Sequence, residues 1–130
     1  MCFACGQANP IGLKIRFSLR GEHCTGTFTA NENHVGYENT VHGGIIFAAL
    51  DDVMANLLYL QDIKAHTARC EIRYRQPLPI ATPVVLTGWI ESERRRLFVL
   101  KGEARLEDGT LIGGYLPPAT LSARLEGAAE

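Results

Sequence analysis

Two adjacent carboxylates, Asp51 and Asp52, lie in the middle of the apolar segment "TVHGGIIFAALDDVMANLLYL". On a helix, the side chains three and four positions from Asp51 are apolar, whereas those around Asp52 include Asn56. Apolar surroundings make a charge costly and a carboxylate more basic. Asp51 is therefore the leading candidate for acid–base or nucleophilic chemistry. A solvated helix edge or an internally hydrogen-bonded acid explains the same pattern, and both alternatives stay open, above all for Asp52.

A His-Gly-Gly sequence, His42 to Gly44, precedes the same apolar run. The glycines let the backbone turn tightly into a helix and let a ligand approach its first N–H groups. Those N–H groups lack intrahelical partners and lie at the positive end of the helix dipole. They would suit a carbonyl oxygen that acquires negative charge. A tight turn explains a Gly-Gly at a helix start equally well.

The separation of these two features along the helix bears on oligomeric state. Gly43 and Asp51 are eight residues apart, which is ~12 Å along a helix axis. Groups that act on one reacting centre must both lie about 3 Å from it. If both act on one substrate, they must come from two chains whose helices lie antiparallel across a two-fold axis. The sequence therefore predicts a homodimer if the chain is an enzyme, and leaves open a further pairing into a homotetramer.

The elements that position these residues follow from the hydrophobic pattern. Apolar residues cover most of the circumference of a predicted helix from about Gly43 to about Leu60, which is typical of a helix wrapped by protein. Strands are predicted over residues 12–20, 24–30, 67–79, 83–92, 96–108 and 111–123. Asp108-Gly109 marks the hairpin between the last two. This order predicts an α+β fold in which an antiparallel β-sheet wraps around one long central helix.

Composition limits the class of protein. A chain of 130 residues with 46% hydrophobic content can bury one core, so we expect a single domain over residues 1–130. Thirteen basic and fourteen acidic side chains give a formal net charge of −1, which favours neither nucleic acid nor an acidic membrane as a partner. The sequence contains neither a secretory signal nor an apolar run approaching ~20 residues. A cytoplasmic protein with reduced cysteines is predicted.

The cysteines raise a metal-binding alternative. Cys2 and Cys5 form a C-x-x-C pair, and His23 with Cys24 would complete a four-ligand zinc site. Adjacent residues rarely converge on one metal, and Cys24 begins a predicted strand. The prediction is therefore no metal and no cofactor, with zinc as the alternative. Cys70 has the position of a small apolar residue inside a strand.

These segments resemble a known family, the hotdog-fold acyl-CoA thioesterases of the phenylacetate-pathway (PaaI-like) type. The stretch "HVGYENTVHGGIIFAALDDVMA" is similar to that family's pattern of H-x-G, a short loop, HGG, apolar residues and L-D-[ED]-x-M. The segments "CFACGQANPIGLKIRF", "TARCEIRYRQPLPIATPVVLTGWI" and "EDGTLIGG" also resemble it, so that the resemblance runs from about residue 2 to about residue 114. It implies a hotdog fold and hydrolysis of an acyl-CoA substrate to free acid and CoA. A non-catalytic acyl-CoA-binding hotdog protein is the alternative.

The resemblance also implies roles for individual residues. His42, Gly43 and Gly44 match the HGG, whose glycine N–H polarises the thioester carbonyl. Asp51 matches the catalytic carboxylate, which acts as general base on water or as nucleophile. Thr67 matches a hydroxyl residue that helps to orient the attacking water.

The substrate-binding residues are a second set. His34 and Gly36 match the loop before the HGG, although a hydrogen-bonding side chain that several relatives carry near Gly36 is absent. Phe47 and Met54 are candidates for an acyl pocket, and ordinary core residues have the same spacing. The arginine run at 94–96 consists of Arg94, Arg95 and Arg96. Arginine side chains bind phosphates well, so the run is a candidate for binding the phosphates of coenzyme A. A charged β-turn explains the same run without a ligand. Pro117-Pro118 depart from the family's last strand, so the acyl pocket is expected to differ from those of the relatives. The sequence does not identify the acyl group of the substrate.

Overall fold

The fold is described by a computed structural model over residues 2–74, 76–109, 111–113 and 119–125. Along the chain, the elements are β1 (Ser18–Arg20), β2 (His23–Thr29), the short 3-10 helix η1 (Glu32–His34), β3 (Val35–Tyr37), β4 (Thr40–Val41), α1 (Gly43–Tyr59), β5 (Ala65–Glu71), β6 (Pro83–Arg94), β7 (Leu97–Leu106), β8 (Leu111–Gly113) and β9 (Ala119–Leu125).

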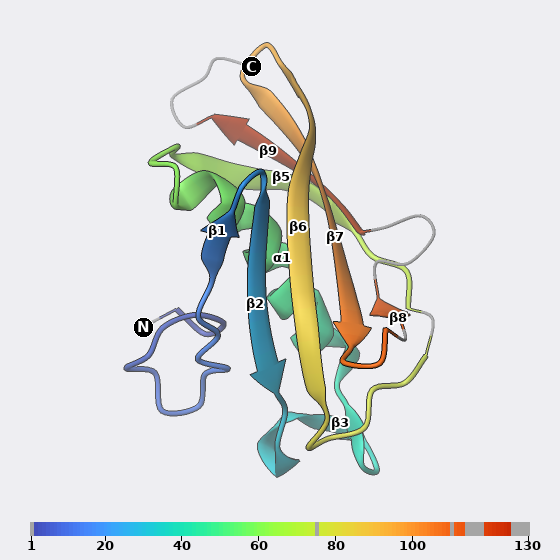
Figure 1. The fold of residues 1–130 in the computed structure, drawn as a ribbon. Helices are drawn as coiled ribbons and strands as arrows, with labels where there is room; N and C mark the ends of the chain where they lie inside the picture. Colours follow the sequence, from blue (N-terminus) through green and yellow to red (C-terminus); the bar gives the residue numbers. More distant parts are fainter. Residues whose placement is uncertain (1, 75, 110, 114–118, 126–130) are drawn as a thin grey trace.

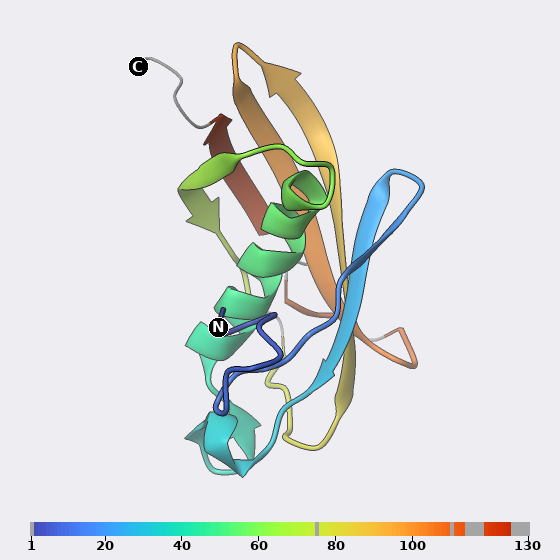
Figure 2. The ribbon, with the colours of Figure 1, turned by 90° about the vertical axis from the view of Figure 1, so that its left-hand side faces the viewer.

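One antiparallel sheet forms the body of the molecule, with the strand order β1-β2-β6-β7-β9-β5 and with β8 paired to β7. The sheet twists strongly, and α1 lies across its concave face (Figures 1 and 2). β3 and β4 form a separate small hairpin close to the start of α1. The predicted α+β class, with a sheet curved around one long helix, is confirmed.

The helix lies close to the sheet because two glycines face it. Gly88 of β6 and Gly102 of β7 are direct cross-strand partners. A Cβ atom on Gly88 would come within 3.2 Å of the Val53 carbonyl oxygen, and one on Gly102 within 3.0 Å of the Met54 side chain. The inward face of α1 can therefore bury its large apolar residues completely; these include Leu50, Val53, Met54 and Leu57.

Two predicted strands are shorter than expected. In the segment 12–20, only the three residues of β1 form a strand. Lys14 has a positive φ of 56°, which interrupts the extended backbone. The N–H groups of Leu13 and Ile15 bond to backbone carbonyls at the N-terminus instead of to the sheet. The strand predicted over 67–79 is β5, which begins at Ala65 and ends at Glu71. β1 pairs antiparallel with the next strand, β2.

Other boundaries follow the turn residues. α1 ends one residue before the predicted limit. The segment between the predicted strand at 24–30 and the helix forms η1, β3 and β4. Gly109 has a φ of +94° in the predicted hairpin after β7. The predicted last strand is divided into β8 and β9, and Pro117-Pro118 lie outside the described residues.

Candidate active site

Asp51 is held by a hydroxyl from the edge strand β5. The Thr67 Oγ1 donates a hydrogen bond of 3.3 Å to Asp51 Oδ1. The register of β5 shifts between Thr67 and Arg69, which is a β-bulge. In a regular strand, residues three apart point to opposite faces, yet the bulge lets both Thr67 and Cys70 approach the helix.

The surroundings of the two acids make both more basic than in water. Burial raises the pKa of Asp51; the Thr67 hydrogen bond opposes this, and the charge of Asp52 adds to it. Burial also raises the pKa of Asp52, against hydrogen bonds from Cys5 and Asn56. Asp51 is thus a stronger base than a carboxylate in water, and Asp52 is an internally hydrogen-bonded acid.

The start of α1 uses the His42 side chain as its cap. The Nδ1 of His42 accepts a hydrogen bond of 2.8 Å from the Gly44 N–H, while the His42 carbonyl accepts from Ile45 and Ile46. In the part of the chain that the structure describes, the Gly43 N–H has no protein acceptor. Of the two glycine donors predicted from sequence, Gly43 is therefore the one left to bind a ligand. A neutral His42 that accepts at Nδ1 carries its proton on Nε2, which is a second donor.

The loop before the helix positions His42. The His34 carbonyl accepts a hydrogen bond of 2.8 Å from the His42 N–H, and the buried His34 ring accepts one from the Asn31 N–H. A Cβ atom on Gly36 would lie 2.9 Å from the Cα of His42, so only glycine permits this approach. Substrate binding by His34 and Gly36 stays a prediction, while their contacts in the protein hold His42 in place.

Tyr74 belongs to this region and was not predicted from sequence. Its hydroxyl donates a hydrogen bond of 2.8 Å to the Gly43 carbonyl, and its ring lies beside Gly43. Burial raises the pKa of Tyr74, and the charge of Cys70 adds to this. The two bonded residues are 31 positions apart, so no local pattern indicates the contact.

A comparison with family models decides the class of protein. Residues 38–112 match the model of the thioesterase superfamily. The chain belongs to the thioesterase superfamily. This confirms the predicted enzyme class, a thioester hydrolase. No curated protein sequence matches the chain.

Several solved structures resemble most of the chain. A thioesterase superfamily protein is 24% identical, with a TM-score of 0.82 over 94% of this chain and 61% of that one. A hypothetical thioesterase of Streptococcus pneumoniae, solved with coenzyme A, is 16% identical, with a TM-score of 0.78 over 89% and 88%. The PaaI protein of the Escherichia coli phenylacetic acid degradation operon is 17% identical, with a TM-score of 0.79 over 90% and 83%. These similarities confirm the predicted hotdog fold.

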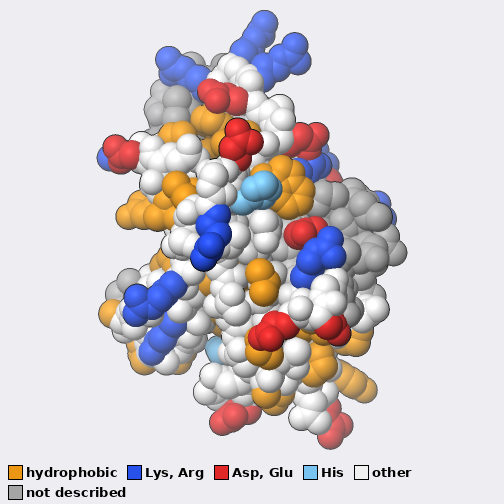
Figure 3. All heavy atoms as spheres, in the orientation of Figure 1, with side chains coloured by type: hydrophobic (Ala, Val, Ile, Leu, Met, Phe, Trp, Pro, Cys, Tyr) orange, Lys and Arg blue, Asp and Glu red, His pale blue; other side chains and the backbone are white. Residues whose placement is uncertain are grey.

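Two predicted pocket residues of this thioesterase, Phe47 and Met54, lie on different faces of α1. Met54 is fully buried beneath Gly102, in the position of an ordinary core residue. Phe47 is on the outer face of α1 with 37% of its surface exposed. The arginine run at 94–96 forms the exposed tip of the β6–β7 hairpin, where basic side chains gather (Figure 3). This tip and the start of α1 lie at opposite ends of the molecule (Figures 1 and 2).

Proposed function

We propose that this thioesterase hydrolyses acyl-CoA to a free acid and CoA, with Gly43 of one protomer and Asp51 of the partner subunit at one active site. The observation that carries the proposal is the setting of Asp51, a half-buried carboxylate of raised pKa that Thr67 holds in place. Coenzyme A in the Streptococcus pneumoniae structure and acetyl-CoA in that of smu.793 from Streptococcus mutans support the substrate class.

In the proposed reaction, the thioester carbonyl oxygen accepts a hydrogen bond from the Gly43 N–H, and the Nε2–H of His42 is a second donor. Asp51 takes a proton from water, whose oxygen attacks the carbonyl carbon. The C–S bond then breaks, and CoA leaves with a proton as the thiol. In the alternative route, Asp51 attacks the carbonyl carbon directly, the C–S bond breaks and CoA leaves as the thiolate, which is then protonated. Water hydrolyses the resulting anhydride to the free acid and the Asp51 carboxylate. Both routes require the carboxylate and the polarised carbonyl.

The continuous helix supports a site shared between two protomers. Gly43 and Asp51 belong to one unbroken α1, which keeps them ~12 Å apart along its axis. Residues at intervals of four form one outward ridge on this helix, and it contains Gly43, Phe47, Asp51, Ala55 and Tyr59. Phe47 and Tyr59 are 37% and 74% exposed. Two such ridges packed antiparallel would cover these apolar groups and bring each Gly43 toward the Asp51 of the partner subunit.

The test is release of free thiol from short, medium, long and aromatic acyl-CoAs. We expect the wild type to hydrolyse at least one of them and Asp51→Asn to lose ~10²–10⁴-fold in kcat, because the base or nucleophile is gone. Asp62→Asn is the matched control, since Asp62 is exposed in the turn after α1 with a φ of 61°, which asparagine tolerates. We expect it to retain activity.

Two results would contradict the proposal. One is a folded wild-type protein that binds acyl-CoA in calorimetry and turns none over, which would favour the non-catalytic binding protein. The other is an Asp51→Asn variant that keeps the activity of Asp62→Asn.

A further inference from the structure

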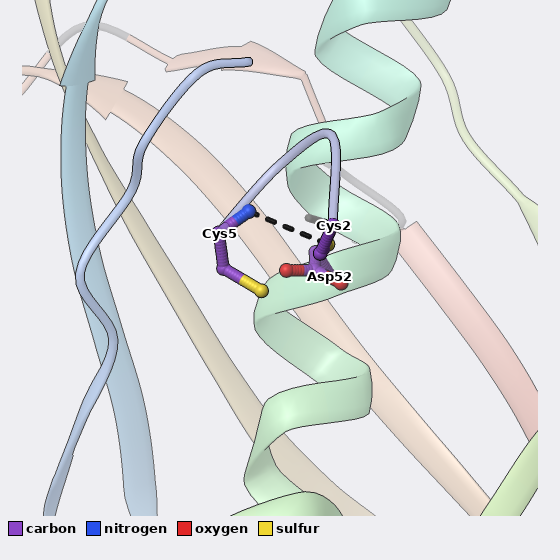
Figure 4. Close-up of side chains that lie close together, drawn as sticks. All are labelled: Cys2, Cys5 and Asp52. Carbon is purple, nitrogen blue, oxygen red and sulfur yellow. Dashed lines mark hydrogen bonds between the residues drawn. The ribbon is translucent and has the colours of Figure 1, made fainter. Parts of the chain in front are cut away.

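The N-terminal turn brings two thiols to the middle of α1, beside the acid that the proposed reaction does not use. Cys2 and Cys5 lie in this turn, and Asp52 projects from the helix toward them (Figure 4). Their ligand atoms, two sulfurs and a carboxylate oxygen, all lie within 4.8 Å of one another. Cys2 is exposed and the other two are partly buried, so the cluster is accessible from solvent.

Backbone hydrogen bonds hold the turn in shape. The Cys2 carbonyl accepts from the Gly6 N–H at 2.9 Å, and the Cys2 Sγ accepts from the Cys5 N–H at 3.4 Å (Figure 4). The carbonyls between the two cysteines, at Phe3 and Ala4, accept from the backbone at residues 13 and 15. The spacing of the two thiols is thus fixed by the fold.

The carboxylate is oriented as well. The Asn56 side-chain amide donates to the Asp52 carbonyl oxygen at 2.9 Å and to Asp52 Oδ2 at 3.1 Å. Asn56 is itself 9% exposed, so this contact is shielded from water. A side chain that orients a ligating carboxylate in this way is typical of metal sites.

We propose that Cys2, Cys5 and Asp52 bind one Zn²⁺ ion, with water in the fourth position. Two thiolates and a carboxylate are ligands that suit this borderline-soft cation. A tetrahedral zinc ion separates its ligand atoms by roughly 3.5–3.8 Å, so closing the cluster on the metal brings any two ligand atoms closer by at most about 1.3 Å.

The charge balance and the space around the cluster fit a bound cation. Two thiolates and the Asp52 carboxylate carry three negative charges, and a divalent ion leaves one of them. A cavity of about 660 Å³ lies at the cluster, with Lys64 in its wall. The lysine can offset the remaining charge, and the cavity leaves room for the water ligand.

The ligand set differs from the four-residue alternative considered from sequence. Cys24 is fully buried in β2, and His23 lies beside the Trp89 ring, with the ring centres 6.1 Å apart. Asp52 takes their place as the third ligand.

The experiment uses the untagged chain of 130 residues, kept reduced and stripped of metal with a chelator. The chain is titrated with Co²⁺ and then with Zn²⁺. We expect one equivalent of Co²⁺ to give near-ultraviolet thiolate charge-transfer absorption, and one equivalent of Zn²⁺ to abolish it by displacement. This spectrum reports thiolate ligation in the wild type and does not depend on how any variant folds. Substrate is not needed, so failure here leaves the thioesterase proposal untouched.

Variants identify the ligands. We expect the double variant Cys2→Ser/Cys5→Ser to lose the charge-transfer absorption, and Asp52→Asn to keep it with weaker affinity. Asn56→Ala removes the residue that orients Asp52 and should weaken zinc binding by roughly 10–100-fold. His23→Ala and Cys70→Ser are matched controls that should bind as the wild type does. The proposal is overturned if the wild type gives no thiolate absorption, if the absorption survives in the double variant, or if His23→Ala abolishes it.

Discussion

At the scale of single residues, the proposed base and the proposed carbonyl-binding group differ in how far the sequence predicts them. Asp51 is predictable, because an acid that interrupts an apolar helix needs a reason to be there. The different roles of Gly43 and Gly44 are not predictable, because only the folded backbone brings His42 Nδ1 to the Gly44 N–H. Among the described residues, this leaves the Gly43 N–H without an acceptor. Contacts between distant segments, such as Tyr74 with Gly43, have no signature in local spacing.

The role of the Gly43 N–H can be isolated with two substitutions. Gly43→Pro removes the N–H, and proline is tolerated at the first position of a helix; His42, at φ −57° and ψ 134°, has a backbone compatible with a following proline. We expect kcat to fall ~10²–10³-fold, as for loss of one oxyanion donor. Gly43→Ala keeps the N–H, and its Cβ would meet Tyr74 at an ordinary 3.7 Å, so it should retain most activity. Equal activity in the two variants would remove Gly43 from the mechanism.

The reactivity of the Cys70 thiol reports the charge of the neighbouring Asp51 side chain. Burial raises the pKa of Cys70 to about 11, and the charges of Asp51 and Glu71 add to this. Because only the thiolate is alkylated, Cys70 should react slowly near pH ~8.5, the pKa of a free cysteine. Asp51→Asn removes one repelling charge, lowers the pKa of Cys70 and should speed its alkylation, measured by mass spectrometry of the labelled peptide. An unchanged rate would mean that Asp51 carries no charge next to Cys70.

At the scale of elements, periodicity predicts the helix far better than the first strand. The apolar run and the His-Gly-Gly fix α1 to within a residue at its end, because a long buried helix satisfies its own backbone. The segment at 12–20 alternates as a strand does, yet its backbone bonds to the N-terminal turn, a competing partner that alternation does not reveal. The bulge in β5, which aims Thr67 at Asp51, likewise depends on the strand beside it.

The close contact of helix and sheet can be tested at the paired glycines. Gly88→Ala would place a methyl group 3.2 Å from the Val53 backbone carbonyl, which cannot move without shifting α1. We expect a loss of ~1–3 kcal/mol in the free energy of unfolding. Gly102→Ala meets the flexible Met54 side chain instead, and should cost less. Urea denaturation of both variants measures the difference, and an equal cost would contradict the packing described for α1.

At the scale of the whole molecule, the outward ridge of α1 is the surface that we expect a second protomer to cover. It presents Phe47 and Tyr59 to solvent around a half-buried acid. The homodimer, the single-domain assignment over residues 1–130 and the cytoplasmic location stay predictions. No helix in the described residues is long and apolar enough to span a membrane.

Mixed dimers test whether the site is shared. Asp51→Asn and Gly43→Pro are expected to be nearly inactive alone. In a heterodimer of the two, one site combines the intact Gly43 of the first chain with the intact Asp51 of the second. We expect purified heterodimers to show about half the wild-type activity, because one of two sites is complete. If each chain carries its own complete site, the heterodimer will stay as inactive as its parents.

Within the described part of the chain, strand β5 lies at the edge of the sheet and pairs with β9 alone. Edge segments open with a smaller free-energy cost than central ones. Opening β5 would part Thr67 from Asp51 while α1 stays packed on the remaining strands. If Asp51 is the base that we propose, a folded chain with β5 open would be inactive, and contacts that keep β5 closed would raise the active fraction of folded chains.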